Sequence, residues 1–283
     1  MAMKTNRAGE MEYLTFPAFE ETGIVTHMVS TRTGGVSRGI FASMNYNYKR
    51  GDDPAAVDEN FRRTAAVFGT GTDAFVCGEQ THITNVRIVT EDDRGKGVTR
   101  EKDYTDVDGL VTDVPGLILS TFYADCVPLM FVDPVKRVIG CSHSGWRGTV
   151  AEMGRVTVET MERVYGCRPE DILAGIGPSI CKNCYEVSAD VAEAFFGLFS
   201  EERYGFCKTE DILERKENGK YRLDLRKANE AVLFGSGILP GHLSVSGLCT
   251  CCHPDYLFSH RASQGKRGNF GAFIMLRKEQ GTT

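Results

Sequence analysis

The feature that most constrains this chain is a group of apolar runs between residues 106 and 150. The runs at 117–123 and 127–132 are dense in branched and aromatic residues, and Asp133-Pro134 separates them from another run at 138–141. Short apolar runs bounded by turn residues are typical of buried strands. We therefore interpret the stretch as two buried strands joined by a turn at Asp133-Pro134.

A cysteine and a histidine accompany these two predicted strands. Cys126 lies inside the first apolar stretch, and His143 follows the second. Antiparallel pairing about the turn would bring the two side chains near each other across the sheet. A thiol and an imidazole within reach of each other are either a nucleophile with its base or two ligands of one metal ion. The residues alone leave both alternatives open.

The composition limits the class of protein. With 283 residues and 41% hydrophobic side chains, the chain can bury a large core in one α/β domain or in two. A net charge of −5 argues against a general surface for nucleic acid or anionic membranes, although a small basic pocket would not show in that sum. The N-terminal residues lack a signal-peptide core, and no run of about 18 apolar residues occurs, so we expect a cytoplasmic protein.

Cap and turn residues predict the remaining elements. These are a capped helix from Asp53 to Gly69, two short strands in 74–90 broken at 80–82, helices beginning at Thr149, Ser188 and Asp224, and late strands in 243–250 and 270–276. Strands and helices alternate in parts and cluster elsewhere, so we predict an α/β (α+β) fold of mixed sheets covered by helices. We expect residues 1–22 to be an N-terminal extension with the first strand, and residues 23–283 to be a single catalytic domain.

Two glycine-containing loops are candidate anion sites. In STRTGGVSRG, backbone N–H groups can turn toward an anion while Arg32 or Arg38 supplies charge, although composition alone favours an ordinary solvated turn. After His143, Gly145 and Gly148 place free N–H groups and Arg147 at a predicted helix N-terminus. That arrangement is suited to binding phosphate or another anion.

Five further cysteines lie in two short segments. Cys181 and Cys184 form a C-x-x-C, and Cys249, Cys251 and Cys252 form a second group. Together they could supply a four-thiolate structural zinc site, but the separation of the segments is not that of a zinc ribbon or finger. The C-x-x-C also lacks the strand-to-helix context of a thioredoxin-like redox pair. We therefore favour a set of buried or half-buried thiols.

The segment ADCVPLMFVDP followed by HSGWRGT resembles the YfiH or laccase-domain family, whose members were once called multicopper polyphenol oxidoreductases. Further segments match in family order, namely STRTGGVSRGIFASMNYN, GDDPAAVDENFRR, EQTHITNV, DVDGLVTDVPG, GIGPSICKNCYEV, LDLRKANEAVLFGSGI and GLCTCCHPDYLFSHRASQGKRGNFGAFIML. The resemblance covers nearly the whole chain, and the ADC and HSGWRG pair is its most specific part. One departure is Ile83, which follows His82 where relatives often carry a small residue.

The resemblance implies a single α/β domain with one zinc ion held by two histidines and one cysteine. The family positions match His82, Cys126 and His143, which are also the implied catalytic residues. Taken singly, His82 would be a structural histidine more often than a ligand. Three protein ligands leave a fourth position for water or substrate, and bound zinc lowers the pKa of such a water toward ~7. Copper fits the same donors.

Similar proteins are purine nucleoside enzymes. They phosphorolyse adenosine, inosine, guanosine and methylthioadenosine to the base and ribose 1-phosphate, and they also deaminate adenosine, so purine nucleosides and phosphate are the expected partners. Phosphate that attacks C1′ of the ribose needs cationic and backbone donors to hold it. The residues that we assign to phosphate or substrate binding are Arg32, Gly34, Gly35, Ser37, Arg147, Gly148 and Arg261.

Three alternatives belong to other classes. Copper-dependent polyphenol oxidation needs several coppers, and six histidines without an HxH pair argue against a multicopper cluster. A Cys126–His143 dyad with Asp125 or Asp108 as the orienting acid would be a hydrolase. The third alternative is a non-catalytic role in cell-wall assembly, because similar proteins have been linked to the editing of peptidoglycan precursors.

Overall fold

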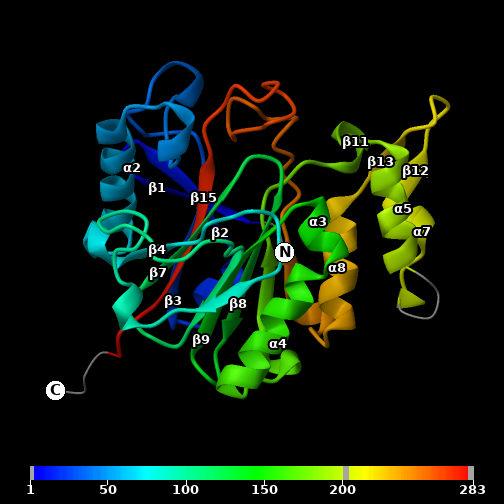
Figure 1. The fold of residues 1–283 in the computed structure, drawn as a ribbon. Helices are drawn as coiled ribbons and strands as arrows, with labels where there is room; N and C mark the ends of the chain where they lie inside the picture. Colours follow the sequence, from blue (N-terminus) through cyan, green and yellow to red (C-terminus); the bar gives the residue numbers. More distant parts are fainter. Residues whose placement is uncertain (1–2, 200–203, 280–283) are drawn as a thin grey trace.

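The computed structural model describes residues 3–199 and 204–279, and its elements form four layers (Figure 1). Two six-stranded sheets lie between two layers of helices. The first sheet has the order β1 (Lys4–Ala8), β2 (Met11–Thr15), β3 (Val25–Ser30), β15 (Phe270–Leu276), β7 (Ile118–Tyr123) and β4 (Phe75–Cys77). The second has the order β14 (Leu243–Val245), β10 (Leu173–Ile176), β8 (Val127–Asp133), β9 (Val138–Ser144), β6 (Gly109–Thr112) and β5 (Val86–Ile88).

Both sheets are mixed. The pairs β4–β7, β10–β14 and β5–β6 run parallel, and the other neighbours in the two sheets run antiparallel. A smaller antiparallel sheet has the order β11 (Glu186–Val187), β13 (Tyr221–Leu223) and β12 (Leu213–Arg215). The predicted class, mixed sheets covered by helices, is therefore confirmed.

Alternate side chains of a strand contribute to two different apolar clusters, one on each face of the sheet. On β8, Leu129 and Phe131 join the apolar cluster on the helix side, whereas Met130 and Val132 join the cluster between the two sheets. Successive side chains of a strand point to opposite faces, so a strand that is apolar throughout must be covered on both sides. That requirement explains why the sheet that holds β8 lies between a helix layer and the other sheet.

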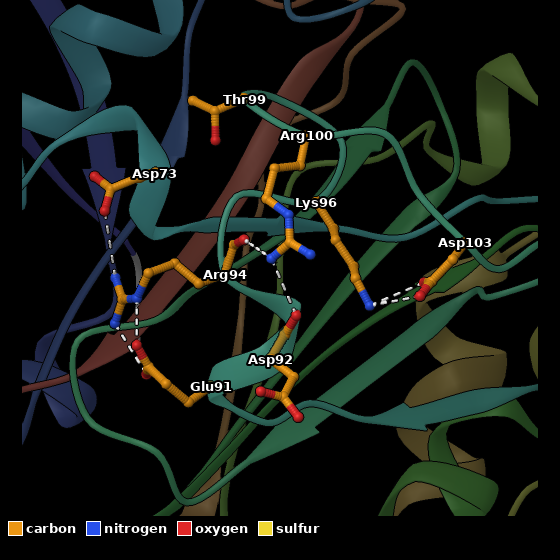
Figure 2. A pocket seen from close by; sticks show the side chains of 8 residues that line it. All are labelled: Asp73, Glu91, Asp92, Arg94, Lys96, Thr99, Arg100 and Asp103. Carbon is orange, nitrogen blue, oxygen red and sulfur yellow. Dashed lines mark hydrogen bonds and ion pairs between the residues drawn. The ribbon is translucent and has the colours of Figure 1, made fainter.

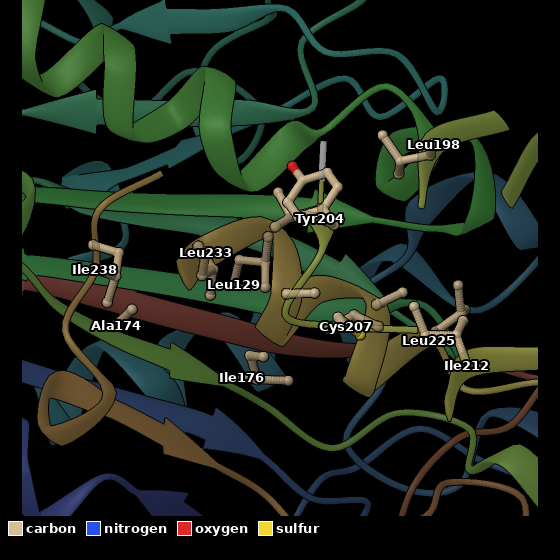
Figure 3. Close-up of a cluster of buried hydrophobic side chains, with 14 of the residues drawn as sticks. Leu129, Ala174, Ile176, Leu198, Tyr204, Cys207, Ile212, Leu225, Leu233 and Ile238 are labelled. Atoms are coloured by element: carbon tan, nitrogen blue, oxygen red, sulfur yellow. The ribbon is translucent and has the colours of Figure 1, made fainter. Parts of the chain in front are cut away.

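Helices cover the two outer faces. On the first sheet lies α2 (Pro54–Val67), and on the second lie α4 (Met153–Tyr165) and α8 (Leu225–Gly235) (Figure 1). The shorter helices are α1 (Pro17–Glu21), α3 (Trp146–Val150), α5 (Ala189–Leu198) and α7 (Thr209–Ile212). Figure 3 shows Leu129 and Ile176 of the second sheet in one cluster with Leu225 and Leu233 of α8. Among the described residues, no helix has the length and apolar character needed to cross a membrane.

The predicted helix caps are confirmed in two of three cases. The side chain of Asp53 accepts a hydrogen bond from the backbone N–H of Ala55, and the side chain of Asp224 accepts one from Lys227. Ser188 occupies the N-cap position of α5 but makes no side-chain cap hydrogen bond. All three helices nevertheless begin where the cap residues predict.

Other boundaries differ from the prediction. The helix expected to begin at Thr149 is two helices, α3 and α4, because Glu152 adopts a φ of 56° between them. The predicted N-terminal extension holds two strands, β1 and β2, and β2 pairs with β3 in the first sheet. The first apolar stretch is also two strands, since β7 belongs to the first sheet and β8 to the second.

Candidate metal centre

Three side chains converge where the chain passes between the two sheets. His82 lies on the crossover from β4 to β5, Cys126 lies on the crossover from β7 to β8, and His143 lies within β9. One nitrogen of each imidazole and the Cys126 sulfur all lie within 4.8 Å of one another. The structure thus brings together the three residues that the resemblance assigns to a metal.

The antiparallel pairing predicted from the sequence accounts for part of this geometry. β8 and β9 pair with Pro128 opposite His143, so Cys126, two residues before Pro128, lies beside the histidine. His82 arrives from the other crossover, and its ring centroid lies 4.9 Å from that of His143, edge to face. His82 has a φ of 68°, and Asp125, which precedes the cysteine, has a φ of 89°. Such values are costly for residues with a side chain, so the surrounding contacts must hold both turns.

Asp108 holds both histidines. Its side chain is fully buried and accepts hydrogen bonds from the backbone N–H groups of Thr81 at 2.8 Å, His82 at 3.1 Å and Ile83 at 3.2 Å. The same carboxylate lies 2.8 Å from Nδ1 of His143. A carboxylate on Nδ1 fixes the ring and directs Nε2 to the opposite side, as in many metal-bound histidines. Asp108, rather than Asp125, is therefore the orienting acid.

The electrostatics favour a charged thiolate beside an imidazolium when no metal is bound. Burial acts to raise the pKa of the Cys126 thiol, but the charges and hydrogen bonds of His143 and His82 lower it to about 6. Burial acts to lower the pKa of His143, but the Cys126 thiolate and the Asp108 carboxylate raise it to about 9. A thiolate at neutral pH is the form that binds metals and acts as a nucleophile.

The site is buried at one end and open at the other. His143 is 4% exposed, Cys126 is half-buried and His82 is exposed. Gly145 closes the inner side, since a Cβ atom there would lie 3.0 Å from the Cys126 sulfur and 3.1 Å from Cδ2 of His82. Any side chain at this position would press on two of the three candidate ligands.

A cavity of about 950 Å³ lies beside His82. Its lining includes the aromatic residues Tyr46, Tyr48, Tyr104 and Phe122 and the cationic residues Lys49, Arg50, Lys102 and Arg267. The volume and the mixture of aromatic and charged side chains are typical of a small-molecule site. The lining also includes Glu79 and Glu101, and Glu79 pairs with both Lys49 and Lys102. The exposed end of the three-residue site therefore meets a cavity with aromatic, cationic and acidic side chains.

Arg267 is the most unusual group in this cavity, and the sequence assignment missed it. Its Nε is buried without a hydrogen-bond partner. Burial and the charge of Arg50 lower its pKa to about 10. No ion pair to either arginine is present within residues 3–199 and 204–279. The charge of Asp125 acts in the opposite direction on the pKa of Arg267. Two guanidinium groups that line one cavity form a cationic site that an anion would stabilise. The basic character of 258–269 was visible in the sequence, but not which arginine faces the cavity.

The first predicted anion loop has a packing role in the structure. Arg32 donates from Nε to the carbonyl of Ala42 at 2.7 Å and from Nη1 to that of Pro254 at 2.5 Å, and its guanidinium lies 4.4 Å from the Phe258 ring centroid. These contacts occupy the group that was assigned to phosphate. Arg32 joins the segment before β15 to the N-terminal part of the chain.

The glycines and serine of the same loop are also engaged internally. The N–H of Gly35 donates to Oγ of Ser43 at 3.0 Å, and buried Ser37 accepts a hydrogen bond from Nδ2 of Asn60 at 3.0 Å. A Cβ atom on Gly34 would lie 2.3 Å from Cα of Met11. These residues thus permit close backbone packing, and the structure does not bring them to the three-residue site with open donors.

The second predicted anion loop does lie at the site. Gly145 is the N-cap of α3, so the backbone N–H groups of Arg147 and Gly148 belong to the first turn of a helix that begins beside Cys126. The Arg147 guanidinium stacks on Trp146, 4.3 Å from the ring centroid. Trp146 also packs against the core on the helix side of the second sheet.

Arg261 lies on the same flank. Its guanidinium is 5.3 Å from the ring centroid of Tyr185 and donates to the carbonyls of Cys184 and Glu186. The backbone N–H of Arg261 donates to the carboxylate of Asp125, the residue before Cys126, at 2.7 Å. Arg261 therefore lies near the site, but two of its donors are already used by the backbone.

A second hollow on the surface has a different character (Figure 2). It has a volume of about 530 Å³ and is lined by charged side chains. Arg94 pairs with Glu91 at 2.5 Å, and Lys96 pairs with Asp103 at 2.9 Å. Two cations of this hollow are thus paired with acids, and a third, Arg100, donates to the backbone carbonyls of Asp92 and Arg94.

The arrangement of four further cysteines corrects our interpretation of them as separate thiols. We favoured separate buried or half-buried thiols, but the sulfur atoms of Cys181, Cys184, Cys249 and Cys252 all lie within 4.8 Å of one another. Their two segments are distant in sequence and are brought together by the fold. The structure therefore favours the four-thiolate alternative.

Comparison with known proteins agrees with this geometry. A family model described as multi-copper polyphenol oxidoreductase laccase matches residues 26–277. A Deinococcus radiodurans protein named purine nucleoside phosphorylase is 41% identical over 92% of this chain and 92% of its own length. A protein named adenosine deaminase RL5, from an unknown prokaryotic organism, is 33% identical over 82% of this chain and 87% of its own. The crystal structure of the Bacillus licheniformis hypothetical protein YfiH superimposes with a TM-score of 0.88 at 33% identity, and covers 96% of this chain and 99% of that one.

Proposed function

Because this chain belongs to the laccase-domain family, whose relatives bear the names purine nucleoside phosphorylase and adenosine deaminase, we propose that it is a zinc-dependent purine nucleoside phosphorylase that also deaminates adenosine. The proposed substrates are adenosine, inosine, guanosine and methylthioadenosine, each with phosphate. The observation that carries the proposal is the convergence of His82, Cys126 and His143 beside a cavity that Arg50 and Arg267 also line.

The donor set fits zinc. Zinc binds imidazole nitrogen and thiolate sulfur at about 2.0–2.3 Å, so three ligand atoms of one ion lie roughly 3–4 Å apart. The three candidate atoms lie within 4.8 Å of one another, and Asp108 holds the ring of His143 in the orientation a ligand needs. Bound there, the ion would act as a Lewis acid and lower the pKa of a coordinated water to about 7.

The same donors also fit copper. A multicopper oxidase would need several ions close together, whereas only one group of candidate ligands among the described residues contains histidine. The family name therefore fits this chain less well than the relatives' enzyme names do. Elemental analysis of the purified protein distinguishes the two metals directly.

The cavity wall supports the phosphorolysis part of the proposal. Arg267 and Arg50 line the cavity that His82 enters, and the charge of Cys126 acts on Arg267. Phosphate held by two guanidinium groups would be bound by charge-assisted hydrogen bonds, which also fix its orientation. We assign this pair to phosphate in place of Arg32, whose Nε and Nη1 donate to backbone carbonyls.

The aromatic wall supports nucleoside binding. Tyr48, Tyr104 and Phe122 line the cavity and offer ring faces to a purine base. On the other flank, Arg147 and Gly148 present first-turn N–H groups beside Cys126. We assign these two residues, with Arg261, to the substrate rather than to a second phosphate.

A product assay tests the proposal. Purified protein with adenosine and phosphate should yield adenine and ribose 1-phosphate, and without phosphate it should yield inosine and ammonia. Cys126→Ala should abolish both sets of products, and Cys251→Ser serves as the matched control because its sulfur is outside both candidate groups. Failure of the zinc-loaded protein to convert any of the four nucleosides would refute the proposed function.

One observation favours a second candidate. Cys126, His143 and Asp108 form a thiolate, imidazole and carboxylate series like that of cysteine hydrolases. Complete removal of metal separates the two candidates. A metal enzyme loses adenosine turnover and regains it with zinc, whereas a cysteine hydrolase keeps its activity without metal and loses it on alkylation of Cys126.

A further inference from the structure

Four cysteines from two distant segments meet near the surface. Cys181 is the N-cap and Cys184 the last residue of the short 3-10 helix Lys182–Cys184, and Cys249 and Cys252 lie in the segment after β14. Their sulfur atoms all lie within 4.8 Å of one another, and those of Cys184 and Cys252 are 3.5 Å apart. The fifth cysteine of these segments, Cys251, is not part of the group.

The spacing suits a single tetrahedral ion. Zinc binds thiolate sulfur at about 2.3 Å, so the sulfurs at two corners of a tetrahedral site lie about 3.8 Å apart. An iron–sulfur cluster distributes its four cysteines over two or four iron atoms, so the sulfurs that bind different irons lie further apart than those of a single-ion site. Four soft sulfur donors in tetrahedral order are characteristic of zinc.

Backbone contacts bring the two segments into register. The N–H groups of Cys181 and Cys252 donate to the sulfur of Cys249, at 3.2 and 3.4 Å. Ser179 and Cys249 form an isolated parallel bridge, in which the N–H of Thr250 donates to the carbonyl of Ser179 at 3.2 Å. Amide hydrogen bonds to sulfur stabilise a thiolate more than a neutral thiol. Backbone hydrogen bonds thus hold the two cysteine-bearing segments together and support the sulfur of Cys249.

We propose that Cys181, Cys184, Cys249 and Cys252 bind a structural zinc ion, distinct from the His82–Cys126–His143 site. This inference does not depend on the proposed function. Four protein ligands fill the coordination sphere and leave no position for substrate, so the ion stabilises structure and takes no part in the reaction.

The position of the four-cysteine group indicates what the ion stabilises. The turn before Cys126 is held by the same two segments: the N–H of Ile180 donates to the carbonyl of Asp125 at 3.0 Å, and Oγ1 of Thr250 donates to its carboxylate at 2.6 Å. The N–H of Arg261 donates to the same carboxylate at 2.7 Å. Asp125 has a φ of 89° and needs such support. The second ion would stabilise the two segments whose hydrogen bonds hold Asp125 and so position Cys126.

The test counts metal by elemental analysis on protein purified under reducing conditions. The unmodified chain should hold two zinc ions, and Cys184→Ser, Cys252→Ser and Cys126→Ala should each hold one. Cys251→Ser is the matched control and should hold two. One zinc per unmodified chain, or two retained by both Cys184→Ser and Cys252→Ser, would overturn the proposal.

X-ray absorption on Cys126→Ala identifies the ligands of the remaining ion, and does not require the cysteine-group variants to fold. We expect a first shell of sulfur alone at about 2.3 Å. Nitrogen in that shell, or a Cys184–Cys252 disulfide in metal-free purified protein, would contradict the assignment. An active enzyme with a single zinc would refute the second site alone, and a two-zinc protein without nucleoside activity would refute the proposed function alone.

Discussion

Two groups of candidate metal ligands on this molecule differ in the number of ligands that they supply, and this number decides their roles. The His82–Cys126–His143 group has three candidate ligands and runs from buried His143 to exposed His82, which lines a cavity. The four-cysteine group has a complete set of four protein ligands. A metal site with a free position can do chemistry, whereas a closed one can only hold segments together.

The two groups also differ in how the fold supports them. We call His82, Cys126 and His143 the open group, and the four cysteines the closed group. Asp108, which is fully buried, orients the histidines of the open group, whereas backbone N–H groups support the closed group. Asp125 connects the two, since it precedes Cys126 and is held by the segments that carry the four cysteines. Variants in either group should therefore affect metal content at their own site, and only those of the open group should change chemistry directly.

The largest expected effect follows from removing the sulfur of the open group. Cys126→Ala should lower both phosphorolysis and deamination on the order of a thousandfold, because a metal ion contributes several kcal/mol to stabilising transition-state charge and each 1.4 kcal/mol is a factor of ten. The measurement is kcat/KM for both reactions, with Cys251→Ser as the control. Activity within about threefold of the unmodified enzyme would remove Cys126 from the mechanism.

Asp108→Asn tests the support of the open group alone. Removing the carboxylate that orients a metal-bound histidine typically costs about 10- to 100-fold in metal affinity or activity. Competition with a chelator should show that loss at one of the two sites and no change at the other. Equal weakening of both ions would mean that Asp108 acts through folding.

Arg267→Ala separates the two reactions of the open group. Charge-assisted hydrogen bonds contribute about 1.5–3 kcal/mol, so kcat/KM for phosphate should fall about 10- to 100-fold. Deamination should change by no more than about threefold, because it needs no phosphate. Arg32→Ala is the comparison: its packing contacts predict lower thermal stability with similar effects on both reactions. A loss confined to phosphorolysis in Arg32→Ala would restore the original assignment.

The smallest expected effect follows from adding one methyl group at Gly145. Gly145→Ala places a carbon 3.0 Å from the Cys126 sulfur, so the open group must shift by a few tenths of an ångström. Small misplacements of reacting groups reduce rates, and we expect about a three- to tenfold loss of activity with both metal ions retained. Gly197→Ala, at an exposed position in α5 with no atom near the added methyl, should keep full activity and gain roughly 0.5–1 kcal/mol of stability. Unchanged activity in Gly145→Ala would show that the contact is easily relieved.

Local signals in the sequence predicted much of this structure. Asp53 and Asp224 cap helices as expected, because a cap depends on only a few neighbouring residues. The antiparallel pairing that sets Cys126 beside His143 followed from one turn between two apolar runs. Apolar periodicity does not say which sheet a strand joins, so the crossover between β7 and β8 was not foreseen.

Contacts between distant segments were beyond the sequence patterns. The partners Cys184 and Cys252 are 68 residues apart, and their spacing matches no common zinc motif. Arg267 and Arg32 are equivalent as residue types, but only the fold shows that Arg32 is used in packing and that Arg267 faces the cavity. The family resemblance supplied the third candidate ligand, His82, which its local sequence alone would have left as a structural histidine.

Stepwise metal removal tests the distinction between the two groups most directly. Metal content, adenosine turnover and far-ultraviolet circular dichroism are followed in one sample during titration with a chelator. We predict that turnover is lost as the first equivalent of zinc leaves the open group, while the second equivalent and the fold remain, and that added zinc restores activity. Turnover that survives loss of the first equivalent, or that disappears only together with the fold, would contradict the account.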